Sequence, residues 1–290
     1  MTHVLTLIAS PSATLAPAEL ASSLGAVQWQ WLDQGIALDL FLDAPLSENQ
    51  RTALAAQLDA ERIDFIHQPM AGREKKLLIS DMDSTLIHQE CIDELADKVG
   101  LKPQVAAITE RAMNGELDFK AALRERVALL KDLPETALQE VFTTRITLME
   151  GARTLTQTMR ARGAYCLLVS GGFTFFTARV REALGFHADD ANRLEIADGK
   201  LTGRVLEPIL DKDSKCASLH RAAQEHGLPL KATLAVGDGA NDLPMLLDAG
   251  LGVAYHAKPM VQAQAQHRLN YNDLSALLYA QGIAKKDWVN

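Results

Sequence analysis

The sequence has few cysteines and no long apolar run. Its three cysteines, Cys91, Cys166 and Cys216, are far apart and form no CxxC pair, which argues against a disulfide framework and against a zinc site. This cysteine usage fits a reducing cytoplasm, where we expect the protein to act. No stretch approaches the roughly 18–20 apolar residues of a membrane span, and the N-terminus lacks the Lys/Arg region of a signal peptide.

Positive charge is also scarce, since 29 Lys and Arg face 37 Asp and Glu and give a net charge of −8. Phosphate contacts supply most of the affinity for nucleic acids, so we expect no nucleic-acid partner. The short basic run at 73–76 predicts a solvated linker. With 290 residues, 48% of them hydrophobic, the chain is long enough for one large domain or two smaller ones.

Residues 1–72 predict a small separate domain. Their patterns indicate a strand, a helix, a hairpin turning at Asp33–Gly35, a helix capped by Ser47 and a last strand. The order βαββαβ is typical of a ferredoxin-like sandwich, and the unit loosely resembles the amino-acid-binding ACT fold. A homodimer through this domain is one expectation and amino-acid sensing is another. The first loop, residues 8–17, lacks the glycine expected around a bound ligand, which favours dimerisation.

Residues 73–290 predict an α/β domain. Four short apolar runs alternate with helical patterns, at residues 76–80, 164–170, 232–237 and 251–255. Strands that are apolar on both sides lie between helix layers in a parallel sheet, and such sheets bind ligands at the carboxyl ends of their strands. The first three runs end in polar residues or glycine, which predicts a functional site at that edge.

Two inserts interrupt this alternation. Residues 90–150 are helical and too long for a single crossover, so we expect a helical cap over the strand ends. Apolar residues recur at helical spacing in it, at Ile92, Leu95, Ala96 and Val99 before Gly100, and at Phe119, Leu123, Val127 and Leu130. The second insert, 193–205, has an Asp-Gly pair typical of a β-hairpin turn.

The first strand is followed by Asp81 and Asp83, which could form a calcium loop, a polar surface with a helix cap, or a pair for chemistry. A calcium loop that starts at Asp81 needs glycine at its sixth position and glutamate at its twelfth. Leu86 and Ile92 stand there, which excludes that loop. One carboxylate would suffice for a cap, so the pair favours chemistry over an ordinary acidic surface.

Three further groups follow the later strands or begin a helix. Ser170-Gly171-Gly172 offers a hydroxyl and amides to an anion at a helix start, although glycines there also form ordinary turns. Lys215 alone would be a surface residue. The segment 237–242, Gly-Asp-Gly-Ala-Asn-Asp, combines glycines with two carboxylates that suit a hard cation, or it is simply a turn before a capped helix.

Together these segments resemble the haloacid dehalogenase (HAD) superfamily of phosphotransferases. Asp81–Thr85 matches the DxDST form of its first motif, Ser170-Gly171 the second, Lys215 the third and residues 237–242 the fourth. The resemblance runs from about Leu77 to the C-terminus. It implies a Rossmann-like parallel sheet of the HAD type with an inserted cap.

The resemblance also implies Mg²⁺ as cofactor and roles for the acidic residues. Asp81 would be the nucleophile that forms an aspartyl-phosphate, and Asp83 the general acid and base. The metal would be bound by Asp81, Asp238 and the backbone carbonyl of Asp83.

The other motif residues would bind the phosphoryl group. Lys215, Ser170 and Gly171 would hold its oxygens, and Asn241 would lie near the substrate phosphate. Asp242 would orient Lys215 or a metal-bound water.

The cap segments 87–96 and 113–134 resemble those of the phosphoserine phosphatase family. Glu90 would then meet an ammonium and Arg126 a carboxylate, for which its guanidinium is a bidentate partner; Met113 and Phe119 would line the pocket. The implied reaction hydrolyses O-phospho-L-serine to serine and phosphate, the last step of serine biosynthesis. The ordinary alternatives are a surface ion pair with Glu125 or Asp118 for Arg126 and a helix-dipole contact for Glu90.

Two other functions stay open at the level of the sequence. One is a phosphatase or phosphotransferase on another small phosphorylated amino acid, because one methyl group in a pocket changes affinity by only about 1–3 kcal/mol. The other is a regulatory protein that senses an amino acid through residues 1–72. The four intact motifs argue against a loss of chemistry.

Overall fold

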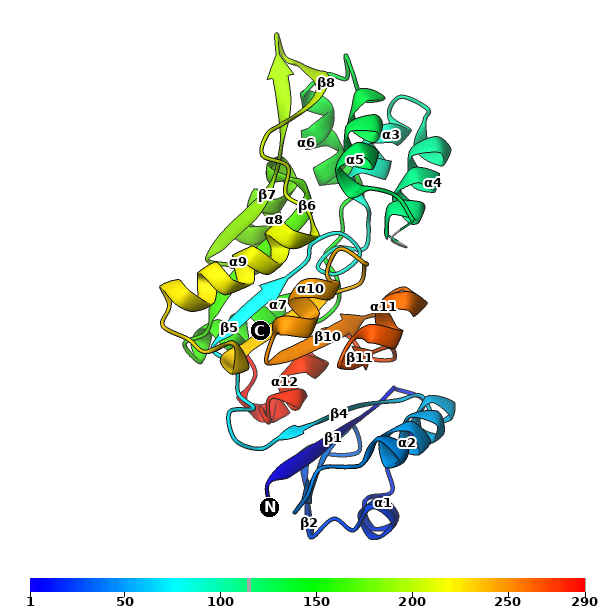
Figure 1. Ribbon diagram of the computed structural model, residues 1–290, viewed down its shortest axis with the longest axis vertical. Helices are drawn as coiled ribbons and strands as arrows, with labels where there is room; N and C mark the ends of the chain where they lie inside the picture. The colour runs from blue at the N-terminus through cyan, green and yellow to red at the C-terminus, as the bar shows by residue number, and fades with distance from the viewer. Residues whose placement is uncertain (114–115, 290) are drawn as a thin grey trace.

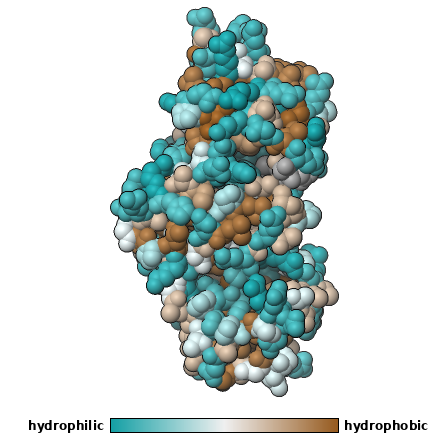
Figure 2. Space-filling model, viewed as in Figure 1, coloured by the Kyte–Doolittle hydropathy of each residue, from teal (hydrophilic) through white to brown (hydrophobic). Residues whose placement is uncertain are grey.

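The structure is a computed structural model that describes residues 1–113 and 116–289, apart from the side chain of Met113. The molecule is elongated, with an N-terminal sheet at one end, a larger sheet with helices in the middle, and a helical cap at the other end (Figure 1). Figure 2 shows hydrophilic residues over much of the visible face, with apolar residues between them in smaller groups. Within the described residues, no helix is long and apolar enough to cross a membrane.

The N-terminal unit has the predicted order of elements. They are β1 (His3–Ala9), α1 (Pro17–Leu24), β2 (Gln28–Asp33), β3 (Ala37–Leu42), α2 (Glu48–Ala60) and β4 (Ile63–Pro69). The strands form an antiparallel sheet in the order β2-β3-β1-β4. Gly25 ends α1 in a left-handed conformation with φ of 64°. Ser47 caps α2 as predicted, in a capping box with Gln50.

Both faces of this sheet are covered. Leu5, Leu7 and Leu40 pack on α1 and α2 in a cluster of their own. On the opposite face, Ile8 and Ile66 belong to the same hydrophobic cluster as the core of the larger domain. The N-terminal sheet therefore shares a core with the rest of the molecule.

The basic run at 73–76 was predicted to be a solvated linker. Lys75 is buried and the Arg73 side chain is mostly covered, whereas Glu74 and Lys76 pair at the surface, so the prediction is wrong for Arg73 and Lys75. The Arg73 guanidinium donates to both carboxylate oxygens of Asp39 on β3, at 2.7 and 2.9 Å, and to the Tyr279 carbonyl. Lys75 is 5% exposed and donates to two backbone carbonyls. The charges of Arg73 and Lys75 are covered because the segment connects two packed units instead of crossing solvent.

The larger sheet has seven strands in the order β11-β10-β9-β5-β6-β7-β8. The strands are β5 (Leu77–Ser80), β6 (Tyr165–Phe173), β7 (Ala188–Ala197), β8 (Lys200–Leu206), β9 (Thr233–Gly237), β10 (Leu251–Tyr255) and β11 (His267–Leu269). All neighbours are parallel except β7 and β8. The predicted parallel α/β sheet is confirmed. The predicted hairpin is also present, with Asp198 and Gly199 at positive φ in its turn.

Helices cover both faces of this sheet. Residues of α7 (Ala152–Ala161), α8 (Thr174–Leu184) and α12 (Ala276–Ala280) pack on one face. Residues of α9 (Lys212–Glu225), α10 (Leu243–Asp248) and α11 (Pro259–Gln264) pack on the other. Two short 3₁₀ segments lie at Leu230–Ala232 and Lys285–Asp287. This layering directs the carboxyl ends of β5, β6 and β9 toward one edge.

The predicted helical cap covers that edge (Figure 1). It comprises α3 (Cys91–Asp97), α4 (Lys102–Met113), α5 (Phe119–Ala128) and α6 (Thr136–Arg145). A bridge between Ile87 and Leu148 joins its two connections to the sheet domain. One detail of the prediction is wrong: Val99 lies beyond the end of α3 and is 36% exposed, because the helix ends two residues earlier than the apolar spacing suggested.

Candidate active site

A narrow cavity lies between the strand ends and the cap. Its volume of about 40 Å³ has room for only a few water molecules. Most of the residues selected from the sequence line it, together with neighbours from the cap: Asp81, Asp83, Glu90, Ile92, Thr109, Ala112, Phe119, Leu123, Arg126, Ser170, Gly171, Gly172, Phe173 and Asn241. The cap therefore leaves little free space over the site, and a ligand larger than a few water molecules would enter only if the cap moved.

Lys215 is buried beside the cavity rather than exposed on a helix surface. Its Nζ lies 2.8 Å from Asp81 Oδ1 and 2.7 Å from Asp242 Oδ1. Burial opposes its charge, but the carboxylates of Asp242 and Asp81 raise the pKa of Lys215 above its usual value. Burial and the nearby Asp242 raise the pKa of Asp81 well above normal despite this lysine. The single positive charge of Lys215 therefore cannot balance the carboxylates of both Asp81 and Asp242.

Asp242 also shapes the loop that follows β9. Its Oδ2 accepts the amide N–H groups of Asp238 and Gly239, at 3.1 and 3.0 Å. Asp238 accepts a hydrogen bond from the Thr85 hydroxyl at 3.1 Å. Burial and the proximity of Asp242 raise the pKa of Asp238 to about 7. Both Asp242 oxygens are therefore engaged, whereas Asp238 has capacity left for a ligand.

The acidic cluster fits a hard divalent cation with oxygen ligands. One carboxylate oxygen from each of Asp81, Asp238 and Asp242 lies within 4.8 Å of the other two. Within the described residues, Oδ2 of Asp81 and Oδ2 of Asp238 accept no hydrogen bond. Asp81 and Asp238 are consequently the better ligands, and a bound cation would balance the charge that Lys215 leaves.

Asp83 and the glycines after β6 fit closely together. Asp83 Oδ1 accepts the N–H of Cys91 at 3.2 Å, and burial raises the pKa of Asp83. A Cβ on Gly172 would lie 2.7 Å from Asp83 Oδ2, and one on Gly171 would lie 2.7 Å from the Phe119 ring. These positions need glycine for space, since neither has a positive φ.

The predicted helix start at Ser170 is wrong. Strand β6 continues to Phe173 and α8 begins only at Thr174, so the Ser170–Gly172 segment offers strand amides to a ligand. The Ser170 hydroxyl accepts the Gly172 N–H at 2.8 Å. Gly171 is fixed from behind, where its carbonyl accepts the Asn192 side-chain amide at 2.8 Å.

Arg126 extends into the cavity from α5 and is 5% exposed. Its Nη1 donates to the Thr109 hydroxyl at 2.9 Å, and that hydroxyl donates to Asp93 at 2.9 Å. Burial lowers the pKa of Arg126. Among the described residues no carboxylate forms an ion pair with it, so neither Glu125 nor Asp118 supplies the predicted surface alternative. The guanidinium is charged, held in place and open to an anionic ligand.

Glu90 is half-buried at the cap entrance. Its Oε1 accepts the Ser84 hydroxyl at 2.7 Å, and Ser84 has a left-handed φ of 55° that orients this contact. Burial, and then the Asp83 carboxylate, raise the pKa of Glu90 to about 8. A ligand cation beside Glu90 would lower this pKa and stabilise the carboxylate form.

Two other predicted residues have different outcomes. Asn241 lines the cavity, and its buried side-chain oxygen has no hydrogen-bond partner among the described residues. The side chain of Met113 lies outside the described residues, so its place in the pocket stays a prediction.

Some contributors were missed from the sequence. Thr85 and Ser84 stand inside the first motif but had been given no role of their own. Gly172 had been noted only as part of the Ser170–Gly172 segment, without a role of its own. Thr109 carries no local signal, because its importance comes from α4 and α5 meeting in space.

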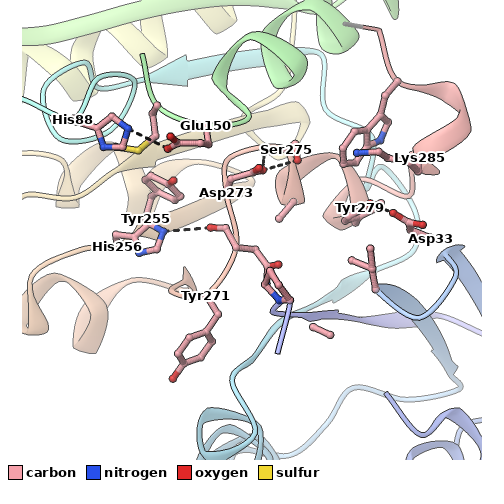
Figure 3. Close-up of a pocket in the computed structure, with 17 residues that line it drawn as sticks. Asp33, His88, Glu150, Tyr255, His256, Tyr271, Asp273, Ser275, Tyr279 and Lys285 are labelled. Carbon is pink, nitrogen blue, oxygen red and sulfur yellow. Dashed lines mark hydrogen bonds and ion pairs between the residues drawn. The ribbon is translucent and has the colours of Figure 1, made fainter. Parts of the chain in front are cut away.

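A larger cavity of about 750 Å³ lies between the N-terminal sheet, the base of the cap and the C-terminal segment. Figure 3 shows its polar groups directed at one another: His88 at Glu150, Tyr279 at Asp33, and Asp273 at Ser275. The hydrogen-bonding groups in these three pairs are already used within the pairs. Among the described residues that line this cavity, no lysine contacts two carboxylates as Lys215 does. The chemistry therefore belongs to the narrow cavity.

Residues 78–247 match the family model of the haloacid dehalogenase-like hydrolases. The chain belongs to the haloacid dehalogenase-like hydrolase family. A phosphoserine phosphatase of Polaromonas is 50% identical over 208 residues, which cover 70% of this chain and 88% of the relative.

Two solved structures are also similar. A HAD family hydrolase from Salmonella enterica has a TM-score of 0.86 at 30% identity and covers 96% of this chain and 98% of its own. An aspartyl-phosphate intermediate analogue of a phosphoserine phosphatase has a TM-score of 0.68 at 42% identity, over 71% of this chain and 98% of its own. The first match includes the N-terminal sheet.

Proposed function

We propose that the chain is a Mg²⁺-dependent phosphoserine phosphatase that hydrolyses O-phospho-L-serine to L-serine and phosphate. The observation that carries the proposal is the charge pattern of the narrow cavity. Arg126 has no ion-pair partner among the described residues, and Glu90 has a carboxyl group that a ligand cation would help to ionise; both lie at the cap side. Asp81, Ser170 and Gly171 lie at the strand side. A phosphorylated amino acid has the complementary arrangement of carboxylate, ammonium and phosphate.

Asp81 is the proposed nucleophile. It follows directly from β5 and lies at the cavity wall, and the charge of Lys215 next to it would reduce the repulsion between a carboxylate and a phosphate dianion. Attack would form an aspartyl-phosphate and break the bond to the serine oxygen. Lys215, Ser170 and the Gly171 amide would bind the phosphoryl oxygens, with Asn241 nearby.

Asp83 is the proposed general acid and base. Its raised pKa favours the protonated form that gives a proton to the departing serine oxygen. The resulting carboxylate then takes a proton from the water that hydrolyses the intermediate. The closed cap would exclude other water during transfer.

The metal would be bound by Asp81, Asp238 and the backbone carbonyl of Asp83. When bound, Mg²⁺ supplies positive charge that offsets the phosphate and carboxylate charges. Asp242 would position Lys215 and the loop of Asp238, because both of its oxygens are committed to those contacts.

Phosphate release from L-phosphoserine with and without Mg²⁺ tests the proposal. We expect rapid, Mg²⁺-dependent release and a kcat/KM well above that for p-nitrophenyl phosphate. Equal activity on both substrates would contradict recognition of the amino-acid part. A panel with phosphothreonine and phosphohomoserine separates the alternative of another phosphorylated amino acid.

We further propose that residues 1–72 and 73–290 are two domains, the first a ferredoxin-like and ACT-like unit. Its βαββαβ order and the strand order β2-β3-β1-β4 support this. Strand β2 is an edge strand with Trp29 42% exposed, next to Val27 at 56%. An exposed apolar edge favours a homodimer through this domain. Sedimentation of the full chain would test it.

The alternative role of this domain is amino-acid sensing. Serine that raised the melting temperature of the full chain, in a variant whose active site no longer binds serine, would favour sensing. The buried thiols of Cys91 and Cys166 and the free thiol of Cys216 agree with the proposed cytoplasmic location.

A further inference from the structure

Three different metal-binding groups meet on the outer side of α9 and α10. Cys216 and His220 are four residues apart on α9 and so lie on one face of that helix. Asp248, the last residue of α10, faces them. Its Oδ2 accepts the Cys216 thiol at 3.4 Å and contacts His220 Nε2 at 2.7 Å. Figure 1 shows the two helices side by side.

We propose that Cys216, His220 and Asp248 bind a transition-metal ion of the zinc class, with water as the fourth ligand. One ligand atom from each of the three lies within 4.8 Å of the others. Tetrahedral zinc ligands are about 3.3–3.5 Å apart at ordinary bond lengths. The distance from Cys216 Sγ to Asp248 Oδ2, 3.4 Å, already matches. The distance from His220 Nε2 to Asp248 Oδ2, now 2.7 Å, would need to increase by about half an ångström. The exposed His220 ring has room for this movement.

The donor atoms determine which metal would bind. A thiolate, an imidazole and one carboxylate select Zn²⁺, Co²⁺ and similar ions, whereas Mg²⁺ prefers oxygen alone. The cluster of Asp81 and Asp238 has only oxygen donors. The two sites therefore prefer different metals and are distinguishable in one protein.

The surroundings favour a cation at this place. Arg221, the adjacent cation on α9, is directed away to Asp190, and Asp213 adds negative charge near the thiol. No sign of this site is visible in the sequence, because the site has a single cysteine and its third ligand, Asp248, lies 28 residues beyond His220.

A catalytic role for Cys216 fits less well. Burial and the hydrogen bond to Asp248 raise the pKa of the Cys216 thiol to about 11, whereas a reactive cysteine needs a lowered pKa. Metal binding would reverse this effect, because the thiol proton would be released to solvent as the metal–sulfur bond forms. His220 Nε2 donates its N–H to Asp248 in this structure, so the imidazole would also carry its proton on Nδ1 instead, which leaves the Nε2 lone pair for the metal.

The site would connect the two helices that carry the Lys215–Asp242 contact. Lys215 directly precedes Cys216, and Asp242 directly precedes α10. A bound ion would add a link between α9 and α10 on the outer side of this ion pair. We therefore expect the metal to raise the melting temperature of the Mg²⁺-loaded protein.

The test is alkylation of the full-length protein by iodoacetamide, read by mass spectrometry, in excess Mg²⁺. Cys91 and Cys166 are both 0% exposed, so Cys216 is the thiol that reacts in the folded protein. One equivalent of Zn²⁺ or Co²⁺ should slow its alkylation about tenfold or more, and further Mg²⁺ should not. Co²⁺ should also give the absorption bands of a tetrahedral thiolate site.

Variants assign the ligands. His220→Gln and Asp248→Asn should lose the protection, while Glu225→Gln, which changes an exposed carboxylate on the same helix outside the cluster, should keep it. Unprotected Cys216 in the wild-type protein would overturn the site. Equal protection in all three variants would do so as well, because the metal would then bind elsewhere.

Discussion

Lys215 Nζ lies between Asp81 and Asp242, 2.8 Å from one carboxylate oxygen and 2.7 Å from the other. All three side chains are almost entirely buried. A buried charge without its partner is costly, so each of these groups depends on the others. The same lysine thus supports the fold and, by our proposal, the phosphate site.

Replacing Lys215 by methionine should reduce both stability and activity. The change leaves the Asp81 and Asp242 carboxylates without their cation, which costs about 3–5 kcal/mol when a buried pair is broken. Urea unfolding measures the first effect and phosphate release the second. Lys75→Met is the matched control, since Lys75 is also buried but donates only to backbone carbonyls. A similar loss of activity in both variants would contradict the special role of Lys215.

Asp81→Asn should abolish turnover and leave the fold intact. The amide has the same shape but is not a nucleophile, so kcat should fall about a thousandfold or more. Phosphate release gives kcat, rapid acid quench detects the aspartyl-phosphate, and circular dichroism checks folding. A folded variant with the wild-type kcat would exclude Asp81 as the nucleophile.

Arg126→Ala should weaken phosphoserine hydrolysis far more than hydrolysis of p-nitrophenyl phosphate. Loss of the charged hydrogen bond to the substrate carboxylate should lower kcat/KM by an amount equivalent to about 1.5–3 kcal/mol. The compound p-nitrophenyl phosphate has no carboxylate and so does not make this bond. Arg124→Ala is the control, because Arg124 lies on the same helix but pairs with Glu207 on the surface. Equal losses on the two substrates would refute the carboxylate assignment for Arg126.

The metal-free protein should become less stable as the pH rises. Asp238 titrates near 7 and Glu90 near 8 in the folded state, against ordinary values of 3.8 and 4.5. Between these limits the folded state holds protons that the unfolded state has lost, so the free energy of unfolding falls with increasing pH.

Thermal unfolding in a chelator from pH ~5 to pH ~8 measures this slope. Asp238→Asn should flatten the slope, because the amide does not titrate. A melting temperature that stays constant or rises over the interval would contradict the raised pKa values of Asp238 and Glu90 in the folded protein.

The sequence predicted the part of the site that follows from topology. Asp81 and Asp238 each follow a buried strand and Ser170 lies near the end of another, and parallel strands end at one edge, so their convergence was expected. The burial of Lys215 and the Thr109 contact to Arg126 depend on how helices pack, which no local pattern encodes. The shared core of the N-terminal sheet was missed for the same reason, since β1 and β4 contact partners more than 200 residues away.

The N-terminal sheet should separate from the rest of the molecule when Arg73 is replaced. Arg73 joins the two parts through both oxygens of Asp39, which is 2% exposed. Arg73→Met leaves that carboxylate buried and unpaired, at about 3–5 kcal/mol. Amide hydrogen exchange in β1 and β4 should then accelerate ahead of exchange in β5.

Lys76→Met provides the comparison, because Lys76 pairs with Glu74 on the surface, where an ion pair contributes about 0–1 kcal/mol. This variant should exchange like the wild-type protein. If Arg73→Met instead accelerated β1, β4 and β5 together, the two parts would unfold as one unit, and the boundary at residue 72 would not be a boundary of stability.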